Sequence, residues 1–230
     1  MSGIVVFGAG GRAGRAVTAE ARARGHAVTA VVRDPARYPD LGAEGVTVAR
    51  GDVTEPGSVA RTVAGHAGAV HAVSPFSGSE QGFETLDPGF FVAAADALLD
   101  GLATAGVGRL VAVGLGANLL GADGRPVMDD PLAFPPEIRP FARAHTAGLH
   151  RLRERGDGPV DWVMLTPAGH LEHGGARTGR YRFGGERLPG GDREPWLSYA
   201  DLAVASVDEI EKPTRHRTRV SVFNYREAKG

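Results

Sequence analysis

The chain has 230 residues, of which 42% are hydrophobic and 23% charged, and its 26 basic and 27 acidic residues leave a formal net charge of −1. This composition is typical of a folded globular protein and excludes a largely disordered chain. The balanced charge provides no overall positive field for nucleic acid or an anionic membrane, and the lack of cysteine excludes disulfides, thiolate metal sites and cysteine nucleophiles.

The first residues, Met1–Phe7, contain no basic segment followed by a long apolar stretch, as a secretory signal would. No apolar run approaches the roughly 18 residues that a membrane span needs. We therefore expect a cytoplasmic protein, a monomer or homodimer, that acts on a small molecule and has neither a nucleic-acid nor a membrane partner.

Short β-branched runs alternate with helical stretches in the first half of the chain. Strands are predicted over 4–7, 27–32, 46–50, 69–73 and 109–113, and helices over 15–24, 58–63 and 90–105. The strand runs are almost continuously apolar, as strands covered by helices on both faces require. The alternation predicts a Rossmann-type α/β fold, a doubly wound parallel sheet in three αβα layers.

The second half of the chain is less regular. Helices are predicted over 140–155 and 199–211, and strands over 162–165 and 220–223; the segments 114–140 and 169–195 have the composition of loops, the latter with a hairpin. No linker and no repeat divides the chain. We expect one domain over residues 1–230, with the two loop segments on its substrate side.

A glycine-rich turn follows the first strand, and Gly8, Gly11 and Gly14 have the spacing G-x-x-G-x-x-G. The first two allow a sharp turn and close approach to a pyrophosphate, and Gly14 allows the helix to pack tightly. The helix N-terminus offers free N–H groups and a partial positive charge. Its place between a strand and a helix favours a dinucleotide site over a structural turn. The candidate residues are Gly8, Ala9, Gly10, Gly11, Arg12, Ala13 and Gly14.

The end of the second predicted strand indicates which dinucleotide binds. An acidic residue there would accept hydrogen bonds from the ribose 2′-OH of NAD, whereas an arginine favours the 2′-phosphate of NADP. Arg33 occupies this position, with Arg12 and Arg37 as helpers, and Asp34 stands one residue late for the NAD role. The sequence predicts NADP(H), with NAD(H) as the alternative cofactor; a surface arginine in an ordinary turn is the competing interpretation of Arg33.

Two further pairs of residues follow predicted strands. Asp52 and Val53 come after the third strand, where such residues commonly border the adenine, although Asp52 is almost as well explained as a turn cap. Ser74 and Pro75 come after the fourth strand, where the chain would pass the nicotinamide half. We assign both pairs to the cofactor site.

Several segments of the second half carry a family resemblance: residues 134–137 and 144–149, Asp161-Trp162, 166–168, 177–184 and 198–203. With the glycine turn, they resemble the atypical short-chain dehydrogenase/reductase proteins described as NADH-flavin reductases, and more weakly biliverdin reductase B. The resemblance implies an NAD(P)H-dependent reductase of flavin or a similar planar acceptor, with FMN or FAD as substrate rather than as a tightly bound cofactor. It also places Gly114 and Pro167 in the cofactor site.

The chain departs from most short-chain dehydrogenases at the Tyr-x-x-x-Lys dyad. Phe141 and His145 have that spacing here, and phenylalanine has no proton to donate, so the usual carbonyl-reductase mechanism is not expected. Ala117 stands where relatives often have a serine. Hydride transfer to a flavin requires mainly that the nicotinamide ring and the flavin ring be stacked.

The candidate catalytic residue is His145. By its resemblance to the histidine of biliverdin reductase B, it would hydrogen-bond the nicotinamide ribose or carboxamide, or relay a proton; the alternative is a histidine that only packs. Arg177, Arg180 and Arg182 are either ligands of a flavin phosphate or solvated loop charges.

His170, Glu172 and His173 cluster on a glycine-rich loop, which rarely makes a metal site, so no metal is predicted. Two other functions stay open: a non-catalytic NADP(H)-sensing regulator resembling NmrA-like proteins, and a reductase dedicated to one secondary metabolite.

Overall fold

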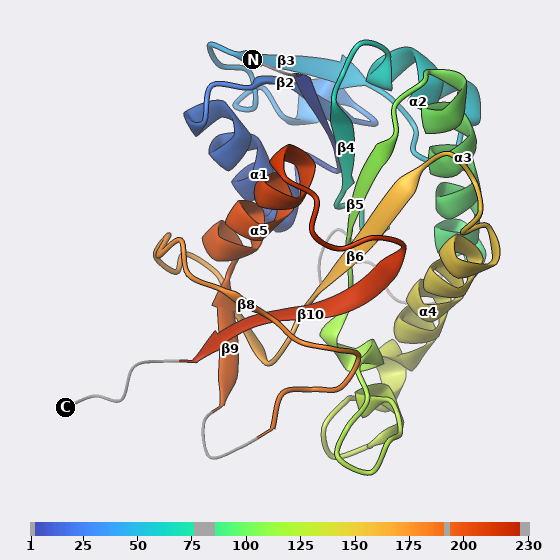
Figure 1. Ribbon diagram of the computed structural model, residues 1–230, viewed down its shortest axis with the longest axis vertical. Helices are drawn as coiled ribbons and strands as arrows, with labels where there is room; N and C mark the ends of the chain where they lie inside the picture. Colours follow the sequence, from blue (N-terminus) through green and yellow to red (C-terminus); the bar gives the residue numbers. More distant parts are fainter. Residues whose placement is uncertain (1–2, 76–85, 191–193, 226–230) are drawn as a thin grey trace.

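The computed structural model describes residues 3–75, 86–190 and 194–225. The sheet described there has ten strands, and seven of them run parallel in the order β3-β2-β1-β4-β5-β6-β10 (Figure 1). Because the strand order reverses between β1 and β4, this is a doubly wound Rossmann-type sheet, and the predicted fold class is confirmed. The parallel strands are β1 (Gly3–Phe7), β2 (Ala27–Val32), β3 (Val46–Arg50), β4 (Gly68–His71), β5 (Arg109–Val113), β6 (Asp161–Pro167) and β10 (Thr218–Tyr225).

Helices cover both faces of this sheet and complete the αβα layers. One face is covered by α1 (Arg12–Ala23) and α5 (Tyr199–Glu211), which pack side by side (Figure 1). The other face is covered by the row α2 (Pro56–Val63), α3 (Phe90–Thr104) and α4 (Arg139–Glu154).

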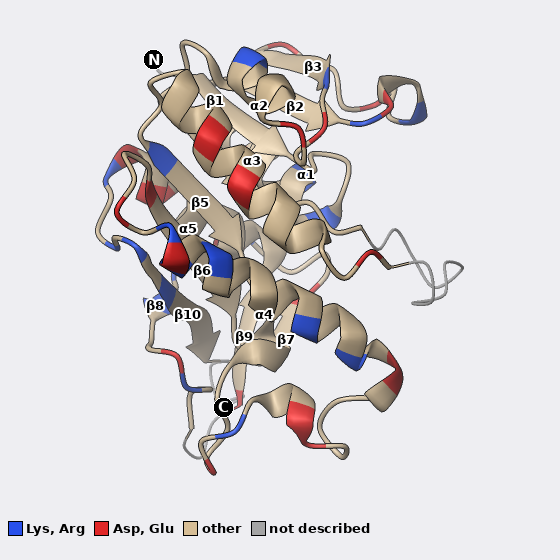
Figure 2. Ribbon diagram, turned by 90° about the vertical axis from the view of Figure 1, so that its right-hand side faces the viewer, with Lys and Arg blue, Asp and Glu red and all other residues tan. Residues whose placement is uncertain are grey.

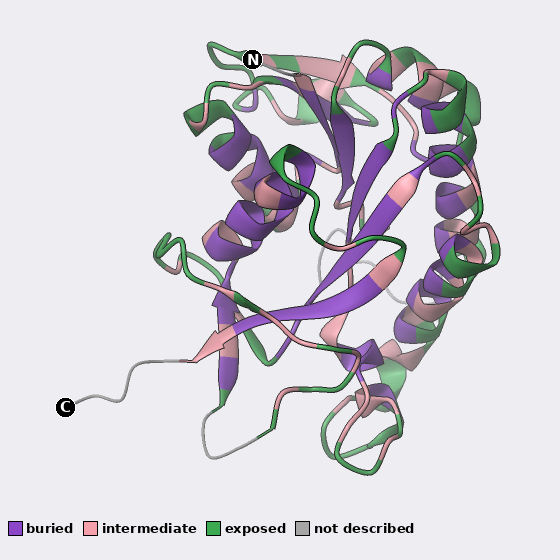
Figure 3. Cartoon of the chain, in the orientation of Figure 1, coloured by how far each residue is buried: buried purple, intermediate pink, exposed green. Residues whose placement is uncertain are grey.

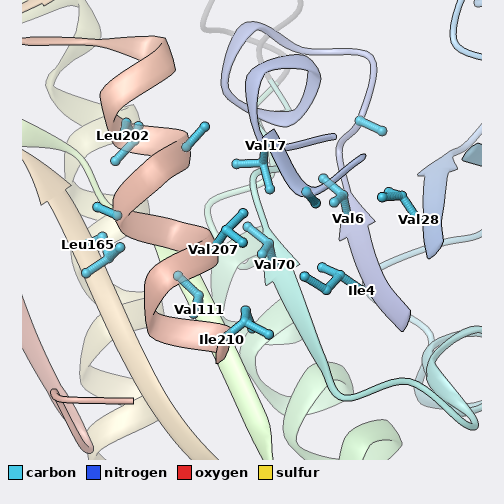
Figure 4. Packing of buried hydrophobic residues seen from close by; sticks show 14 of the residues in the cluster. Ile4, Val6, Val17, Val28, Val70, Val111, Leu165, Leu202, Val207 and Ile210 are labelled. Atoms are coloured by element: carbon cyan, nitrogen blue, oxygen red, sulfur yellow. The ribbon is translucent and has the colours of Figure 1, made fainter. Parts of the chain in front are cut away.

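Successive residues of the central strands are buried on opposite faces. In β1, Ile4 and Val6 pack toward α1 and α5, whereas Val5 and Phe7 join a second cluster on the side of α2 and α3. Figure 4 shows the first of these clusters, and Figure 3 shows burial running along the central strands. Full burial of such side chains contributes about 1.5–3 kcal/mol each. The demand for two apolar faces explains why the strand sequences do not alternate between apolar and polar.

Two element boundaries near the glycine turn differ from the prediction. Helix α1 begins at Arg12, three residues early, because the carbonyl of Gly11 already accepts the Arg15 N–H at 2.8 Å. Strand β4 ends at His71, and after the Ala72 N–H has bonded to the Phe7 carbonyl at 2.9 Å the chain turns away from the sheet. Gly14 therefore lies inside the first turn of α1.

Within its described residues, 169–190 and 194–195, the segment 169–195 forms no hairpin of its own. Strand β7 (His170–Glu172) pairs in parallel with β9 (Pro195–Ser198), and β8 (Arg182–Phe183) pairs antiparallel with β10. The short strands extend the sheet beyond β10 because β9 also pairs with that strand. The other loop segment contains three 3-10 turns, η3 (Gly116–Asn118), η4 (Val127–Asp129) and η5 (Pro136–Ile138), and a further one, η1 (Pro35–Arg37), follows β2.

Ion pairs join α3 to the C-terminal end of α4. Asp96 accepts hydrogen bonds from Arg151 at 2.8 Å and Arg155 at 3.0 Å, and Asp100 accepts from Arg155 at 2.6 Å. Figure 2 shows this face, with acidic bands on α3 and basic bands on α4. The groups are partly exposed, so water screens these pairs. In the part of the chain that the structure describes, no helix is long and apolar enough to cross a membrane.

Candidate cofactor-binding cleft

A cleft of about 1760 Å³ runs along the carboxyl ends of the parallel strands. It exceeds the roughly 300–1,000 Å³ of a typical small-ligand pocket, so it has room for a dinucleotide and a second molecule. Residues at the end of each strand from β1 to β6 line it, as expected for a ligand site at the switch point of a doubly wound sheet. All the predicted site residues line this cleft except Ala9 and Gly14.

The glycine turn is shaped by two close backbone approaches. Gly8 has a φ of +81°, and a Cβ atom there would lie 2.7 Å from the backbone of Ala72. A Cβ on Gly14 would overlap the carbonyl oxygen of Gly8, so α1 rests directly on the turn. Ala9 is fully buried in the core beneath it. Gly14 and Ala9 thus support the turn from the core side. Of the glycines of the turn, Gly8, Gly10 and Gly11 line the cleft.

Gly11 differs from the other two glycines of the motif. Its φ of −79° suits any residue, and the closest atom to an added Cβ would be the Gly8 oxygen at 3.5 Å. Gly11 is exposed and lines the cleft, so the space beside it is open to a ligand. The first N–H groups of α1, from Arg12 onward, have no partner within the helix, and its first turn contains no acidic residue. The positive end of this helix is therefore directed, uncompensated, at the space where a diphosphate would fit.

Arg12, Arg33 and Arg37 line the same end of the cleft. All three are exposed, and none forms an ion pair with any residue that the structure describes. The neighbouring Arg15, by contrast, is bound to Asp40 at 2.6 Å. Asp34 also lines the cleft, and one of its carboxylate oxygens accepts the N–H of Ala36 at 3.2 Å as the cap of η1. The guanidinium groups at this end thus remain available to an anionic ligand.

Tyr38 was missed by the sequence analysis. It lines the cleft, and its ring lies so close to Gly10 that any side chain at that position would clash with it. Arg15 lies over the ring at 6.0 Å and donates through Nε to the Gly10 carbonyl at 3.1 Å. The lack of a side chain at Gly10 is thus explained by tertiary packing, which the G-x-x-G-x-x-G spacing does not encode.

Asp52 and Val53 lie at the edge of the cleft. One carboxylate oxygen of Asp52 accepts from the N–H and the hydroxyl of Thr54, at 2.9 and 2.7 Å. The Asp52 N–H is hydrogen-bonded to Ser58 Oγ at 3.0 Å. Asp52 therefore caps the turn before α2, the structural role considered for it, while it also faces the cleft.

The other end of the cleft is formed by residues at the carboxyl ends of β4, β5 and β6 and by helix α4. Ser74 and Pro75, Gly114 and Pro167 line it together with His145 of α4. Gly114 tolerates no side chain, because a Cβ atom there would overlap the hydroxyl of Thr166. Four segments of the chain thus meet at the end where Ser74, Pro75 and His145 were expected to lie near the nicotinamide.

His145 is buried at the floor of this end, with 7% of its surface exposed. Its ring lies 4.4 Å from that of Phe91 and 6.1 Å from that of Phe141, and its Nδ1 has no hydrogen-bond partner among the described residues. Burial lowers its pKa to about 4. The imidazole is therefore neutral at pH 7, with a buried polar nitrogen still unsatisfied.

A second buried histidine lies behind His145. His71, at the end of β4, has 8% of its surface exposed, and its Nδ1 also lacks a described partner. Burial, with a smaller contribution from His145, lowers the pKa of His71 to about 3. Both rings line a small internal cavity of about 20 Å³, which is large enough for one water molecule.

Phe141 and Ala117 are two positions at which the sequence departs from its relatives, and only the first of them lines the cleft. Phe141 lines the cleft, one helical turn before His145. Ala117 is buried in η3 and packs against Met128 and Ala142, so it does not line the cleft. The alanine therefore fills a small core beside the site.

The described arginines of segment 169–195, which are Arg177, Arg180, Arg182 and Arg187, do not line the cleft. Arg177 donates two hydrogen bonds to Glu20 of α1, at 2.6 and 2.8 Å, and these, more than any other contact, lower the pKa of Glu20 despite its burial. The adjoining Thr178 and Gly179 donate to the buried carboxylate of Asp201. This loop is anchored on α1 and α5.

Most residues that the sequence analysis missed are apolar. Leu115 directly follows Gly114 at the end of β5, where the strand-end rule indicates a ligand site. The side chains from α3, β7 and α5 had no such local signal. The missed lining residues of this end include Asp87, Phe90, Phe91, Leu115, Leu171 and Tyr199.

No group of three metal-ligating side chains occurs within the described ranges.

Comparison with known proteins supports a nicotinamide cofactor. The chain matches the family described as NAD(P)H-binding over residues 8–213. It is 30% identical over 224 residues to the uncharacterized protein YwnB of Bacillus subtilis, covering 96% of this chain and 98% of that protein.

Two crystal structures are similar over almost the whole chain. A Burkholderia pseudomallei protein, proposed by name to be exported, has 33% identity and a TM-score of 0.80, covering 97% of this chain and 100% of the other. A Streptococcus pneumoniae protein, proposed by name to be an NADH-flavin reductase, has 25% identity and a TM-score of 0.77 with the same coverage. The cytoplasmic location stays a prediction. The chain belongs to the NAD(P)H-binding family, among the atypical short-chain dehydrogenase/reductase proteins with oxidoreductase-like Rossmann folds.

Proposed function

We propose that this protein is an NADPH-dependent reductase that delivers a hydride to a flavin or a similar planar acceptor. The observation that carries the proposal is the division of one cleft into two chemically different ends. The end at Gly8–Arg12 offers backbone donors and arginines to a dinucleotide, and the end at His145 offers aromatic and aliphatic walls to a ring.

The choice of NADP(H) over NAD(H) is supported by Arg12, Arg33 and Arg37. A 2′-phosphate needs charge-assisted donors, and these three side chains are cleft-lining and without an ionic partner in the described structure. Asp34, the acid that would favour NAD, is already hydrogen-bonded to the backbone of its own turn. The 2′-OH of NAD would therefore find an arginine where an acceptor is needed.

The bound nicotinamide supplies the hydride, and the protein's task is to hold it against the acceptor. Gly114 and Pro167 provide a wall without a bulky side chain at that end of the cleft. His145, neutral at pH 7, offers one ring nitrogen, a donor or an acceptor according to the tautomer, to a carboxamide or ribose hydroxyl. Phe141, which has no proton to donate, fits an acceptor that itself delocalises the added charge. Proximity and orientation then account for most of the rate enhancement.

The experiment mixes the purified protein with NADPH and riboflavin, FMN, a quinone or biliverdin and follows the absorbance at about 340 nm. Oxidation of NADPH that depends on the acceptor supports the reductase. Tight binding of NADPH by calorimetry without turnover on any of these acceptors would instead favour the NADP(H)-sensing regulator, because Phe141 and His145 fit a site that binds without catalysing. Activity on one other metabolite alone would favour the dedicated reductase.

A further inference from the structure

The charges that line the cleft are distributed unequally. The three cleft-lining arginines all lie at the end formed by β1, β2 and the start of α1. At the other end, the described lining residues include no lysine or arginine. The one carboxylate there is Asp87, and His145 is neutral at pH 7.

The walls of this end are aromatic and aliphatic. Phe141 contacts Phe91, whose ring lies against His145, and Phe90 contacts Phe91 edge to face at 5.2 Å. Leu115 and Leu171 line the same region. Such surfaces favour flat, uncharged rings, because aromatic contacts gain from stacking and provide no compensation for a desolvated charge.

The three arginines that the sequence offered to a flavin phosphate, Arg177, Arg180 and Arg182, do not line the cleft. Arg177 is held by the buried Glu20, and Arg182 lies on β8 outside the cleft lining. Residues 76–85 and 191–193 lie outside the described residues; the sequence of the first segment contains two glutamates and no lysine or arginine, and that of the second contains Asp192 and Arg193. A dianionic phosphate at this end would face Asp87 without a described counter-charge.

We propose, on the basis of the reductase function above, that the acceptor is recognised through an uncharged planar ring system and that any phosphate it carries is not bound by the protein. The acceptor class is therefore that of riboflavin and neutral quinones, in preference to flavin nucleotides. The arginines of the cleft serve the dinucleotide alone.

Riboflavin and FMN test this inference directly, because they share one ring system and differ by the phosphate. Their dissociation constants are measured by quenching of flavin fluorescence with the protein saturated with NADP⁺, and kcat/KM is measured for each with NADPH. We expect riboflavin to bind as tightly as FMN or up to about tenfold more tightly at low ionic strength. Tighter binding of FMN by more than about tenfold, or binding of neither flavin, would overturn the inference.

The two readouts separate this inference from the proposed function. Equal binding of both flavins without turnover would refute the reductase and leave the acceptor class standing. Turnover with a strong preference for FMN would support the reductase and refute the inferred acceptor class.

Variants provide a second test. Asp87→Asn removes the charge but keeps an oxygen for the Gly89 N–H, which Asp87 accepts at 2.8 Å. It should shift the FMN/riboflavin ratio about two- to fivefold toward FMN, and 0.5 M salt should abolish the shift. Asp123→Asn, on an exposed turn outside the cleft, is the matched control. An unchanged ratio for Asp87→Asn, or a selective loss of FMN binding in Arg182→Ala, would contradict the inference.

Discussion

The imidazole of His145 packs against the ring of Phe91 at 4.4 Å between centroids, tilted by 42°. Because α3 and α4 both lie on the same face of the sheet, this contact fixes the histidine between the cleft and the small cavity that it shares with His71. A ring held this way can present a hydrogen-bonding nitrogen in one direction only. His145 is thus suited to orient a ligand, and its lowered pKa argues against a role as an imidazolium acid at pH 7.

Replacement of His145 by alanine should lower kcat about three- to tenfold, which is the effect of one lost neutral hydrogen bond. The dissociation constant for NADPH should change less, because the adenine and diphosphate contacts are distant. Steady-state kinetics and calorimetry measure the two effects. His150→Ala, at an exposed position of the same helix, is the control. An unchanged kcat would assign His145 to packing alone.

Arg33→Ala should weaken NADPH about 10- to 150-fold, as expected when a charge-assisted contact to a phosphate is lost, and should leave NADH nearly unaffected. Isothermal titration with both dinucleotides measures the difference. Arg61→Ala removes an exposed arginine that does not line the cleft and should affect neither. Equal losses for NADPH and NADH would remove the reason for choosing NADP(H).

Gly11→Ala and Gly14→Ala separate the two functions of the glycine turn. An alanine at Gly11 fits the backbone but projects into the open cleft, so cofactor binding should weaken while the thermal midpoint stays within a few degrees. An alanine at Gly14 overlaps the Gly8 oxygen, so α1 must shift and the midpoint should fall. Thermal unfolding with and without NADPH distinguishes them. A normal affinity for NADPH in Gly11→Ala would exclude the diphosphate from that surface.

The sequence predicted the parts of this site that depend on local geometry. Gly8 and Arg33 stand next to strand ends, where the fold rules place ligand-binding residues, and the apolar strands identified the doubly wound sheet. Tyr38 was missed because it reaches Gly10 only through the tertiary fold. Arg177 was considered for a ligand because nothing in its own segment indicates its partner, Glu20, which is 157 residues away.

The two buried histidines should make the protein less stable as the pH falls. Burial lowers the pKa of His71 to about 3 and that of His145 to about 4, whereas an unfolded histidine has a pKa of about 6.5. Between about pH 6.5 and 4 the unfolded chain therefore binds a proton at each position that the folded chain does not. The free energy of unfolding should fall by about 1.4 kcal/mol per pH unit for each histidine, and this loss should be absent above about pH 7.

Urea unfolding at pH 7.5, 6.5 and 5.5 measures this slope. In His71→Gln only His145 of the two buried histidines still titrates. The part of the slope (the change in the free energy of unfolding per pH unit) that comes from these histidines should therefore be halved, and this holds even if the variant is less stable than the original chain at pH 7.5. The exposed His150→Gln should retain the slope of the original chain. Carboxylates such as Glu20 also lose their stabilising ionised form in acid, but they do so equally in all three proteins. The same slope in His71→Gln as in the original chain would mean that His71 accepts a proton in the folded state, and the picture of two neutral imidazoles around a shared cavity would be wrong.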